Sequence, residues 1–236
     1  MTPVMFSCEH ATCAVPEAWR DVFRGEEDAV ASSEGWEPGS LNLAQGFAMK
    51  FRTPLVHGDV TRLLIDLDGE GETRWSRFSA KLSESQRAKL VDRHVRPHRE
   101  QLKQRVLEAV RRETPIVHVL VRTDAAADGT VTLEFPADHD RAGGTARAWR
   151  DAILDRAPEL AVQVRLHPSA PAAAEGLIGE FGADTYAPVT LRVAQTFFLE
   201  GKPCRWEPLK KVLLESLART LEDAVSAPAS PSSDPR

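Results

Sequence analysis

Strand-like and helix-like segments alternate along this chain, and the alternation limits the folds open to it. The clearest strand is 116–122, in which three valines on one face alternate with residues on the other face. The clearest helices are 41–51 and 97–112, whose apolar residues recur at helical spacing. Alternation of this kind is typical of α/β domains. We therefore predict a three-layer α/β/α sandwich around a mixed, largely parallel sheet.

The same patterns place the other elements. Further strands are predicted at 4–8, 54–60, 62–67, 130–135, 160–166 and 189–198, and further helices at 83–95, at about 145–156 and from Glu207 onward. Asp128-Gly129 predicts a hairpin between strands 116–122 and 130–135, which would make the sheet mixed. Pro97 predicts a break or kink in the helical stretch that contains it.

A single domain of residues 1–225 accounts for all of these elements. The following residues, 226–236, are rich in Pro, Ser and Ala and offer no large apolar side chain for burial. We expect this tail to be disordered.

The composition excludes several classes of protein. The net charge is −5, so the chain lacks the basic character of proteins that bind nucleic acids or anionic membranes. No apolar run reaches the roughly 18 to 20 residues that span a bilayer, and the first residues lack a signal-sequence pattern. The three cysteines are too few for a disulfide framework, which favours a reducing compartment such as the cytoplasm.

Two chemically active side chains, Glu9 and His10, directly follow the predicted strand 4–8. In open α/β sheets, ligands bind beyond the carboxyl ends of the strands. An adjacent Glu and His at that position are candidates for metal binding or proton transfer. The alternative is a capped turn without a chemical role.

The segment Ser7-Cys8-Glu9-His10-Ala11, followed by Val15-Pro16, resembles the opening motif of the N-formylglutamate amidohydrolase family. The resemblance continues in register from about residue 3 to residue 217, through 37–40, 61–67, 96–98 and 186–195. It implies a phosphorylase/hydrolase-like fold of the zinc carboxypeptidase-like class. It also implies that zinc is the cofactor and that the reaction cleaves a small amide bond next to a carboxylate.

The resemblance assigns a metal site to this sequence. His10 aligns with the first zinc ligand of the family, and Glu37 aligns with the second, where the family has Asp. The third ligand, a His in a His-Ser-Phe turn, aligns with Arg122. A guanidinium stays protonated and cannot ligate zinc. We therefore expect zinc to be absent or weakly bound, unless His57 or His118 supplies the missing ligand.

Other family positions are replaced as well. Thr190 and Arg192 stand in place of the two glutamates of a strand that should supply the catalytic carboxylate, so no residue is assigned that role. Asp68-Gly69 replaces an Asn-Arg pair that would bind the carboxylate of the substrate. If each loss lowers the rate by roughly 10² to 10⁴, little turnover would remain. The resemblance therefore predicts an impaired or inactive enzyme.

The substitutions also bring new positive charges to the site. Arg122 and Arg192 lie on strand faces that point toward the expected pocket, where they would either pair with acidic residues or bind a carboxylate or phosphate. We leave these two alternatives open, because buried charges need partners in either case. The ligand expected here is a small anion such as an N-acyl amino acid or a dicarboxylate. The residues expected to contact it are Glu9, Arg62, Arg122, Glu175 and Arg192.

The remaining histidines are not assigned to the site. His118 would lie roughly 13 Å along the strand from Arg122, which favours a role in the core. His94 and His98 are spaced i, i+4 on either side of the helix break that we predict at Pro97, and we expect both on the surface.

Three functions remain open on the sequence. The one we favour is an altered relative of the family that binds a small anion in the old pocket. The second is a working metal-dependent amide hydrolase with a substitute third ligand. The third is a structural or interaction protein in which salt bridges close the pocket.

Overall fold

A computed structural model describes residues 2–125, 129–199 and 205–226, and its centre is a six-stranded sheet with the order β2-β1-β3-β6-β4-β5. Neighbouring strands are parallel except β4 and β6, which are antiparallel. The mixed, largely parallel sheet predicted from the sequence is therefore confirmed. The strands are β1 (Val4–Cys8), β2 (Leu55–His57), β3 (Ile116–Asp124), β4 (Thr130–Pro136), β5 (Ala161–His167) and β6 (Tyr186–Ala194).

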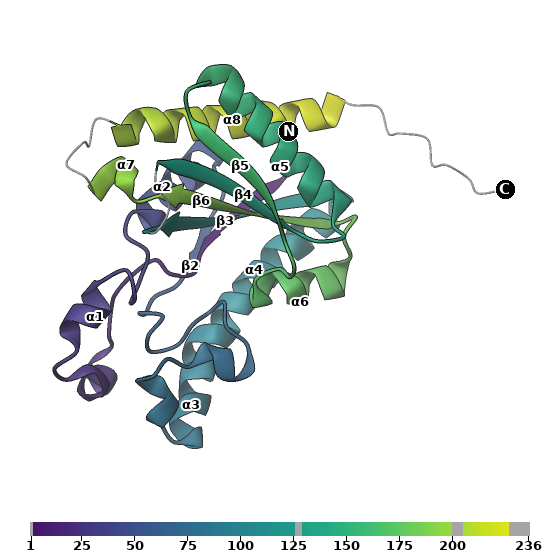
Figure 1. Ribbon diagram of the computed structural model, residues 1–236. Helices are drawn as coiled ribbons and strands as arrows, with labels where there is room; N and C mark the ends of the chain where they lie inside the picture. Colours follow the sequence, from purple (N-terminus) through teal and green to yellow (C-terminus); the bar gives the residue numbers. More distant parts are fainter. Residues whose placement is uncertain (1, 126–128, 200–204, 227–236) are drawn as a thin grey trace.

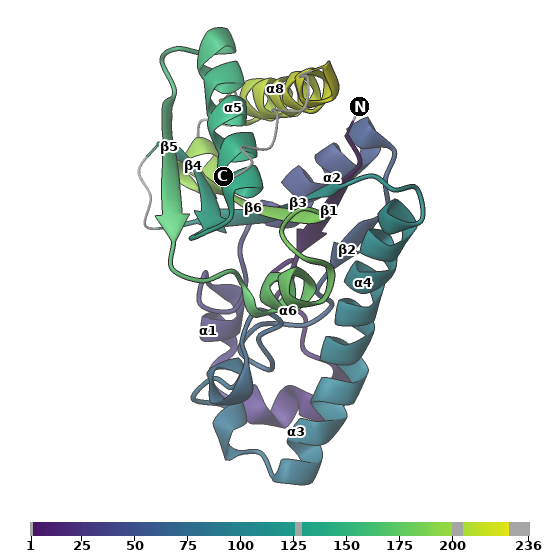
Figure 2. The same ribbon diagram turned by 90° about the vertical axis from the view of Figure 1, so that its right-hand side faces the viewer.

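Helices cover both faces of this sheet (Figures 1 and 2). One face packs against α2 (Ser40–Phe51), α5 (Asp140–Arg156) and α8 (Trp206–Ser226), and the other against α4 (Arg96–Val110) and α6 (Ala172–Phe181). This arrangement confirms the three-layer α/β/α sandwich. The shorter helices are α1 (Glu27–Ala31), α3 (Glu84–Leu90), α7 (Thr196–Leu199) and the 3-10 segments Glu17–Phe23, Gly71–Arg74 and Ser79–Lys81.

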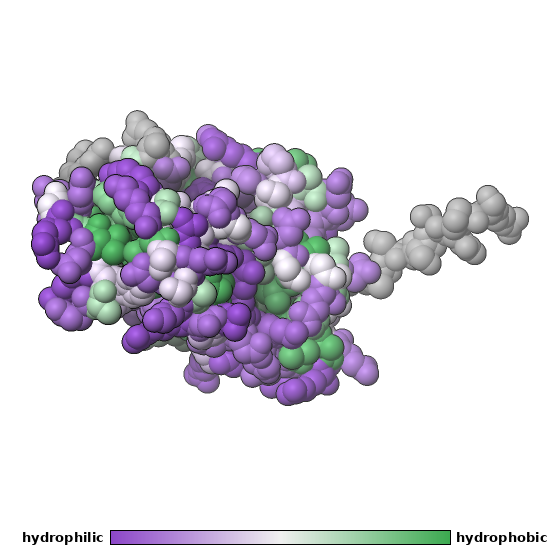
Figure 3. Space-filling model, turned by 90° about the horizontal axis from the view of Figure 1, so that it is seen from below, coloured by the Kyte–Doolittle hydropathy of each residue, from purple (hydrophilic) through white to green (hydrophobic). Residues whose placement is uncertain are grey.

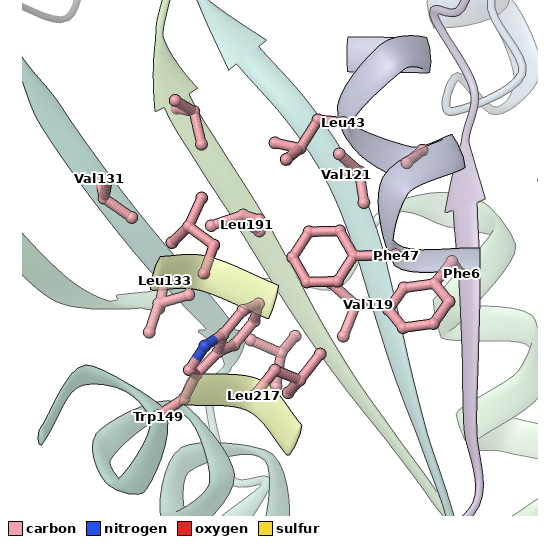
Figure 4. Close-up of a cluster of buried hydrophobic side chains, with 14 of the residues drawn as sticks. Phe6, Leu43, Phe47, Val119, Val121, Val131, Leu133, Trp149, Leu191 and Leu217 are labelled. Carbon is pink, nitrogen blue, oxygen red and sulfur yellow. The ribbon is translucent and has the colours of Figure 1, made fainter. Parts of the chain in front are cut away.

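The larger apolar core lies between the sheet and the layer of α2, α5 and α8 (Figure 4). Phe6 stacks on Phe47 with ring centroids 5.1 Å apart, and Trp149 meets Phe47 edge-on at 6.0 Å. Trp149 is completely buried, and its indole N–H donates to the Ser216 hydroxyl at 3.0 Å. This core comes from the valine-rich strand faces and helix stripes that the sequence pattern identifies.

The hairpin predicted at Asp128-Gly129 is wrong. The strands on either side of it, β3 and β4, are not neighbours, because β6 lies between them and pairs with both. Gly129 itself has a φ of +56°, which suits a turn, but Asp128 lies outside the described residues. A turn signal specifies a local reversal of the chain and does not exclude that a later strand is inserted between the two strands it joins.

The strand expected at 62–67 is also wrong, since this segment forms turns. Its apolar side chains Leu63, Leu64, Ile65 and Leu67 are buried in a smaller cluster below the sheet, next to α1 and α3. A short apolar run indicates burial, and burial is not specific to a strand.

The helix around Pro97 is not broken. A π-helical turn, Val91–Val95, joins α3 to α4, and Pro97 lies in the first turn of α4. His94 and His98 therefore point inward and are each 4% exposed, which corrects the prediction that they lie on the surface. Helix α5 also begins earlier than expected, with His139 as its N-cap, so that Gly143 and Gly144 lie within it.

Seen from below in Figure 3, hydrophilic residues cover most of the molecule and hydrophobic ones form small separate areas. Among the described residues, no helix combines the length and the apolar character needed to cross a membrane. Of the tail expected at 226–236, Ser226 is the last residue of α8, and residues 227–236 lie outside the described residues.

We expect Trp149→Ala to lower the free energy of unfolding by about 3 to 5 kcal/mol, because it leaves a large cavity in the main core. Urea denaturation followed by circular dichroism measures the change. Met49→Ala is the matched control, since Met49 is 80% exposed, and it should change stability by less than about 0.5 kcal/mol. Equal effects of the two substitutions would mean that Trp149 is not a core residue.

Candidate functional site

The candidate site lies at the carboxyl ends of β1 and β3. The chain leaves β1 toward β2 on one side and later returns to β3 on the other, so β1 and β3 form a switch point of the kind at which open α/β sheets bind ligands. Ser7 pairs with Leu120 in the parallel register, and continuing this register by two residues sets Glu9 beside Arg122. Gly58 packs so closely that a Cβ there would collide with the carbonyl oxygen of Glu9.

Arg122 is at the centre of this site and is 2% exposed. Its Nη2 lies 3.3 Å from Glu9 Oε2 and also contacts Asp68 Oδ2, whereas its Nη1 lies 3.5 Å from Glu37 Oε1. Nη1 also lies 2.5 Å from Nδ1 of His10. The guanidinium thus reaches three carboxylates and one imidazole from the protein interior.

His10 receives the guanidinium on one ring nitrogen and faces a carboxylate with the other. A guanidinium can only donate, so we assign Nδ1 as the acceptor from Arg122 and place the ring proton on Nε2. In this tautomer the 2.9 Å contact between Nδ1 and Glu37 Oε1 is not a hydrogen bond. Nε2–H then donates to Asp66 Oδ1 at 2.8 Å. Metal-binding histidines have this same arrangement, with a lone pair toward the cation and the opposite N–H on a carboxylate.

Glu37 and Arg62 complete the cluster. Glu37 Oε1 lies 2.9 Å from His10 Nδ1, and Oε2 accepts from the backbone N–H of Thr123 at 3.3 Å. Arg62 Nη1 lies 3.3 Å from His10 Nδ1, and Arg62 Nε donates to the Glu34 carbonyl oxygen at 2.8 Å. The cluster contains four carboxylates, Glu9, Glu37, Asp66 and Asp68, and two guanidiniums, Arg62 and Arg122.

The charges of the cluster stabilise one another. Burial is the largest influence on the pKa of Glu9 and would raise it, but the Arg122 guanidinium, His98 and Ser7 together lower this pKa to about 2. The pKa of Glu37 is lowered for the same reasons, against burial and chiefly by Arg122. Burial would likewise lower the pKa of Arg122, yet Glu37 and Glu9 raise it. All three groups are therefore ionised at neutral pH.

The residues at this site do not fit a zinc ion. Zinc binds histidine nitrogen at about 2.0 to 2.1 Å, and the space in front of His10 Nδ1 is taken by Arg122 Nη1 at 2.5 Å. Among the described residues, no three His, Cys, Asp or Glu side chains are arranged to hold a metal ion. His57, considered as a substitute ligand, is exposed and bonds through Nδ1 to the Gly58 carbonyl oxygen. It does not reach His10.

His118 belongs to a separate buried network, as expected of a core histidine. It is fully buried, and its ring nitrogens lie 2.8 Å from Ser7 Oγ and 2.5 Å from Tyr186 Oη. Burial lowers the pKa of His118 to about 4, so the ring is neutral. The Ser7–His118 hydrogen bond has no access to solvent and is therefore not a catalytic pair. Cys8 is similarly inert, since burial raises its pKa to about 12.

The two inward histidines beside α4 differ in their partners. His98 Nε2 lies 3.6 Å from Glu9 Oε1, which makes His98 a neighbour of the cluster, and burial lowers its pKa. His94 Nδ1 lies 2.8 Å from Asp59 Oδ1. Glu175, expected to contact the ligand, is exposed on α6 and is not part of the cluster.

Arg192 shares the sheet face of Arg122, as the strand pattern predicts, because the two are register partners in β6 and β3. Its Nε donates to Glu134 Oε2 at 2.7 Å, and it does not bond to Glu9 or Glu37. Arg192 and Thr190 line an open pocket of about 180 Å³ together with Asp68, Glu134 and His167.

Sequence reasoning missed Asp66, Asp68, Glu134 and His167. Asp68 was noted from the sequence only as a replacement of a family residue. Its pairing with Arg122, another replaced position, was not considered. The alternation along 130–136 could have placed Glu134 on the face of Arg192, but only with knowledge that β4 pairs with β6.

The fold is shared with two solved structures. A gene product of Agrobacterium tumefaciens superposes with a TM-score of 0.73 at 17% identity, over 95% of this chain and 92% of that one. An N-formylglutamate amidohydrolase from Ralstonia eutropha superposes with a TM-score of 0.64 at 15% identity, over 95% of this chain and 94% of that one. No family model and no curated protein matches the sequence. The chain therefore has the fold of an N-formylglutamate amidohydrolase, as the resemblance of its motifs implies.

Proposed function

We propose that this protein is a metal-free relative of the amide hydrolases that binds a small ligand without cleaving an amide bond. The observation that carries the proposal is the position of Arg122 Nη1, 2.5 Å from His10 Nδ1. At that position the protein supplies its own cation to the side chains that align with zinc ligands.

The charge of Arg122 is permanent, which supports this assignment over a loosely held metal. Its guanidinium remains protonated at every physiological pH, and Glu9 and Glu37 raise its pKa further. A zinc ion would have to push this guanidinium away from Glu9, Glu37 and Asp68, and would leave its charge inside the protein without those partners. Breaking such a buried pair costs about 3 to 5 kcal/mol, so displacement is unfavourable.

The loss of hydrolysis rests on the positions around the pocket. Thr190 and Arg192 stand where the family has glutamates, and neither side chain can take a proton from water as a carboxylate does. Glu134 is a carboxylate beside the pocket, but it is held in an ion pair with Arg192. Without an activated water and a free base, the reaction named for the Ralstonia relative is not supported here.

Ligand binding rests on the pocket lined by Arg192. Arg122, one of the two cations expected to contact a small anion, is enclosed by its own carboxylates. Arg192 is more accessible, with 35% of its side chain exposed, and its pair with Glu134 uses Nε. A ligand carboxylate would therefore meet Arg192 and not Arg122.

We expect the purified protein to retain substantially less than one zinc per chain after dialysis, and to hydrolyse N-formylglutamate no faster than the uncatalysed background. Arg122 blocks the metal position, and the two carboxylates that line the pocket, Asp68 and Glu134, are each paired with an arginine. Elemental analysis and an amine-release assay measure the two quantities. One bound zinc together with turnover that His10→Ala abolishes would establish a working metal-dependent hydrolase instead.

The substitution Arg122→Ala should create the zinc site that the native protein lacks. It leaves His10 and Glu37 beside uncompensated carboxylates, so zinc should bind and raise the melting temperature of the variant by mass action. The native protein should show no such rise in a thermal shift titration. Arg62→Ala is the control, because it removes a cation of the same cluster but leaves Arg122 in front of His10. A zinc response equal in all three proteins would show that zinc binds elsewhere.

Arg122→Met should lower the free energy of unfolding at pH 7 by about 3 to 5 kcal/mol, because Glu9 and Glu37 lose their main counter-charge inside the protein. Urea denaturation measures this loss of unfolding free energy. In the control Arg156→Met, the lost pair with Glu215 is partly exposed and should contribute less than about 1 kcal/mol. A loss of stability no larger than that of the control would contradict a buried ion cluster.

The same pair of proteins should differ in their dependence on pH. In the native protein the pKa of Glu9 is lowered from 4.5 to about 2, so its contribution to stability is complete above pH 4.5 and is lost as the pH falls toward 2. In Arg122→Met, burial dominates and raises this pKa, so protonation relieves the variant. The stability difference between the two proteins should therefore shrink as the pH is lowered from 7 to 4. A constant difference over that range would argue against Glu9 as the partner of Arg122.

A further inference from the structure

The pocket beside the ion cluster is small and carries both signs of charge. Its volume of about 180 Å³ is below the roughly 300 to 1,000 Å³ of pockets that hold drug-sized ligands, so it suits a ligand of few atoms. Asp68 and Glu134 provide two carboxylates in its wall, and Arg192 provides one guanidinium. Phe135 and Pro188 add apolar surface.

The positive and negative groups of this pocket are adjacent. Arg192 Nε and Glu134 Oε2 lie 2.7 Å apart, and this single bond leaves the other guanidinium nitrogens and Glu134 Oε1 without a hydrogen bond to the described residues. A ligand can therefore donate to Glu134 while it accepts from Arg192, and both contacts form without breaking the pair.

Asp68 supplies a second acceptor with unmet capacity. Its Oδ2 contacts Arg122, whereas its Oδ1 is buried without a hydrogen-bond partner. A buried carboxylate oxygen without a partner is unfavourable. Asp68 also lines the pocket with 19% of its side chain exposed, so its negative charge attracts a cationic group of a ligand there.

We propose that this pocket binds a free α-amino acid, with its carboxylate on Arg192 and its ammonium group between Glu134 and Asp68. The opposite charges of an α-amino acid are adjacent, as are those of Glu134 and Arg192. The proposal names the ligand class of the proposed function, and it rests on that function in taking this pocket as a binding site that does not hydrolyse.

The charge balance disfavours simpler ligands. A dicarboxylate needs two cations, and the one accessible arginine already has a carboxylate beside it. The cluster behind the pocket has four carboxylates against two guanidiniums, which adds a negative field. A simple amine would satisfy the acids but leave the free N–H groups of Arg192 unused.

Isothermal titration calorimetry with four probes tests the proposal: L-alanine, L-serine, N-acetyl-L-alanine and succinate. The two amino acids should bind, and N-acetyl-L-alanine, which lacks the ammonium group, should bind about tenfold more weakly or worse. Succinate should be as weak. If succinate or N-acetyl-L-alanine binds as tightly as the amino acids, the pocket is an anion site and the proposal is wrong. If neither amino acid binds, it is wrong as well.

Variants of the charged pair locate the binding. Arg192→Gln and Glu134→Gln should each weaken L-alanine binding about tenfold or more. The control Arg165→Gln lies on β5, where the guanidinium bonds Gln163 outside the pocket, and it should bind like the native protein. If a single variant fails to fold, the double variant Glu134→Gln with Arg192→Gln removes both charges together, leaves neither one unpaired, and should still lose binding. Unchanged binding in that protein would place the amino acid elsewhere.

These outcomes are separate from the test of the metal-free cluster. Zinc content and amide hydrolysis are measured without any amino acid, so a pocket that fails to bind leaves that assignment intact. Zinc found in the native protein would instead contradict the proposal that Arg122 takes the place of a metal ion. This holds whether or not the calorimetric titrations show amino-acid binding.

Discussion

The structure of the site depends on one buried cation, the guanidinium of Arg122. Four carboxylates and two guanidiniums meet beyond the ends of β1 and β3, and Arg122 is the member that contacts Glu9, Glu37 and Asp68. An unpaired buried charge costs several kcal/mol, and Arg122 is the strongest of the groups that favour the ionised forms of Glu9 and Glu37. His10 shows what this means chemically. Its lone pair faces the cation and its N–H faces Asp66, which is the geometry of a metal ligand without the metal.

The apolar core of the fold does not depend on the charged residues of the site. The apolar faces of β1, β3 and β6 pack against α2, α5 and α8 on the side opposite Arg122, around Phe47 and Trp149. The layers are therefore held by side chains that the chemistry of the site does not use. This separation is consistent with the fold being shared with two solved structures at only 15 to 17% identity.

The sequence predicts the three layers of the fold and the part of the site that lies on β1 and β3. The period of two in 116–122 places Arg122 and Arg192 on one face, and the parallel register then brings Glu9 next to Arg122. The position of β4 is not predictable in this way, because the hairpin signal is local and the pairing of β4 with β6 is not. Glu134 was missed for that reason. His94 and His98 were misplaced because Pro97 does not break the helix, so both side chains face inward.

The register that aligns Arg122 with Arg192 also determines what the pocket can bind. Two guanidiniums side by side on parallel strands repel, so each needs its own carboxylates: Glu9, Glu37 and Asp68 for Arg122, and Glu134 for Arg192. The first group encloses its arginine completely, whereas the second leaves one side of an ion pair open to the pocket. A ligand that carried only negative charge would compete with Glu134 for Arg192. One that carries both signs extends the alternation of charges already present, and this is the physical reason to expect a zwitterion there.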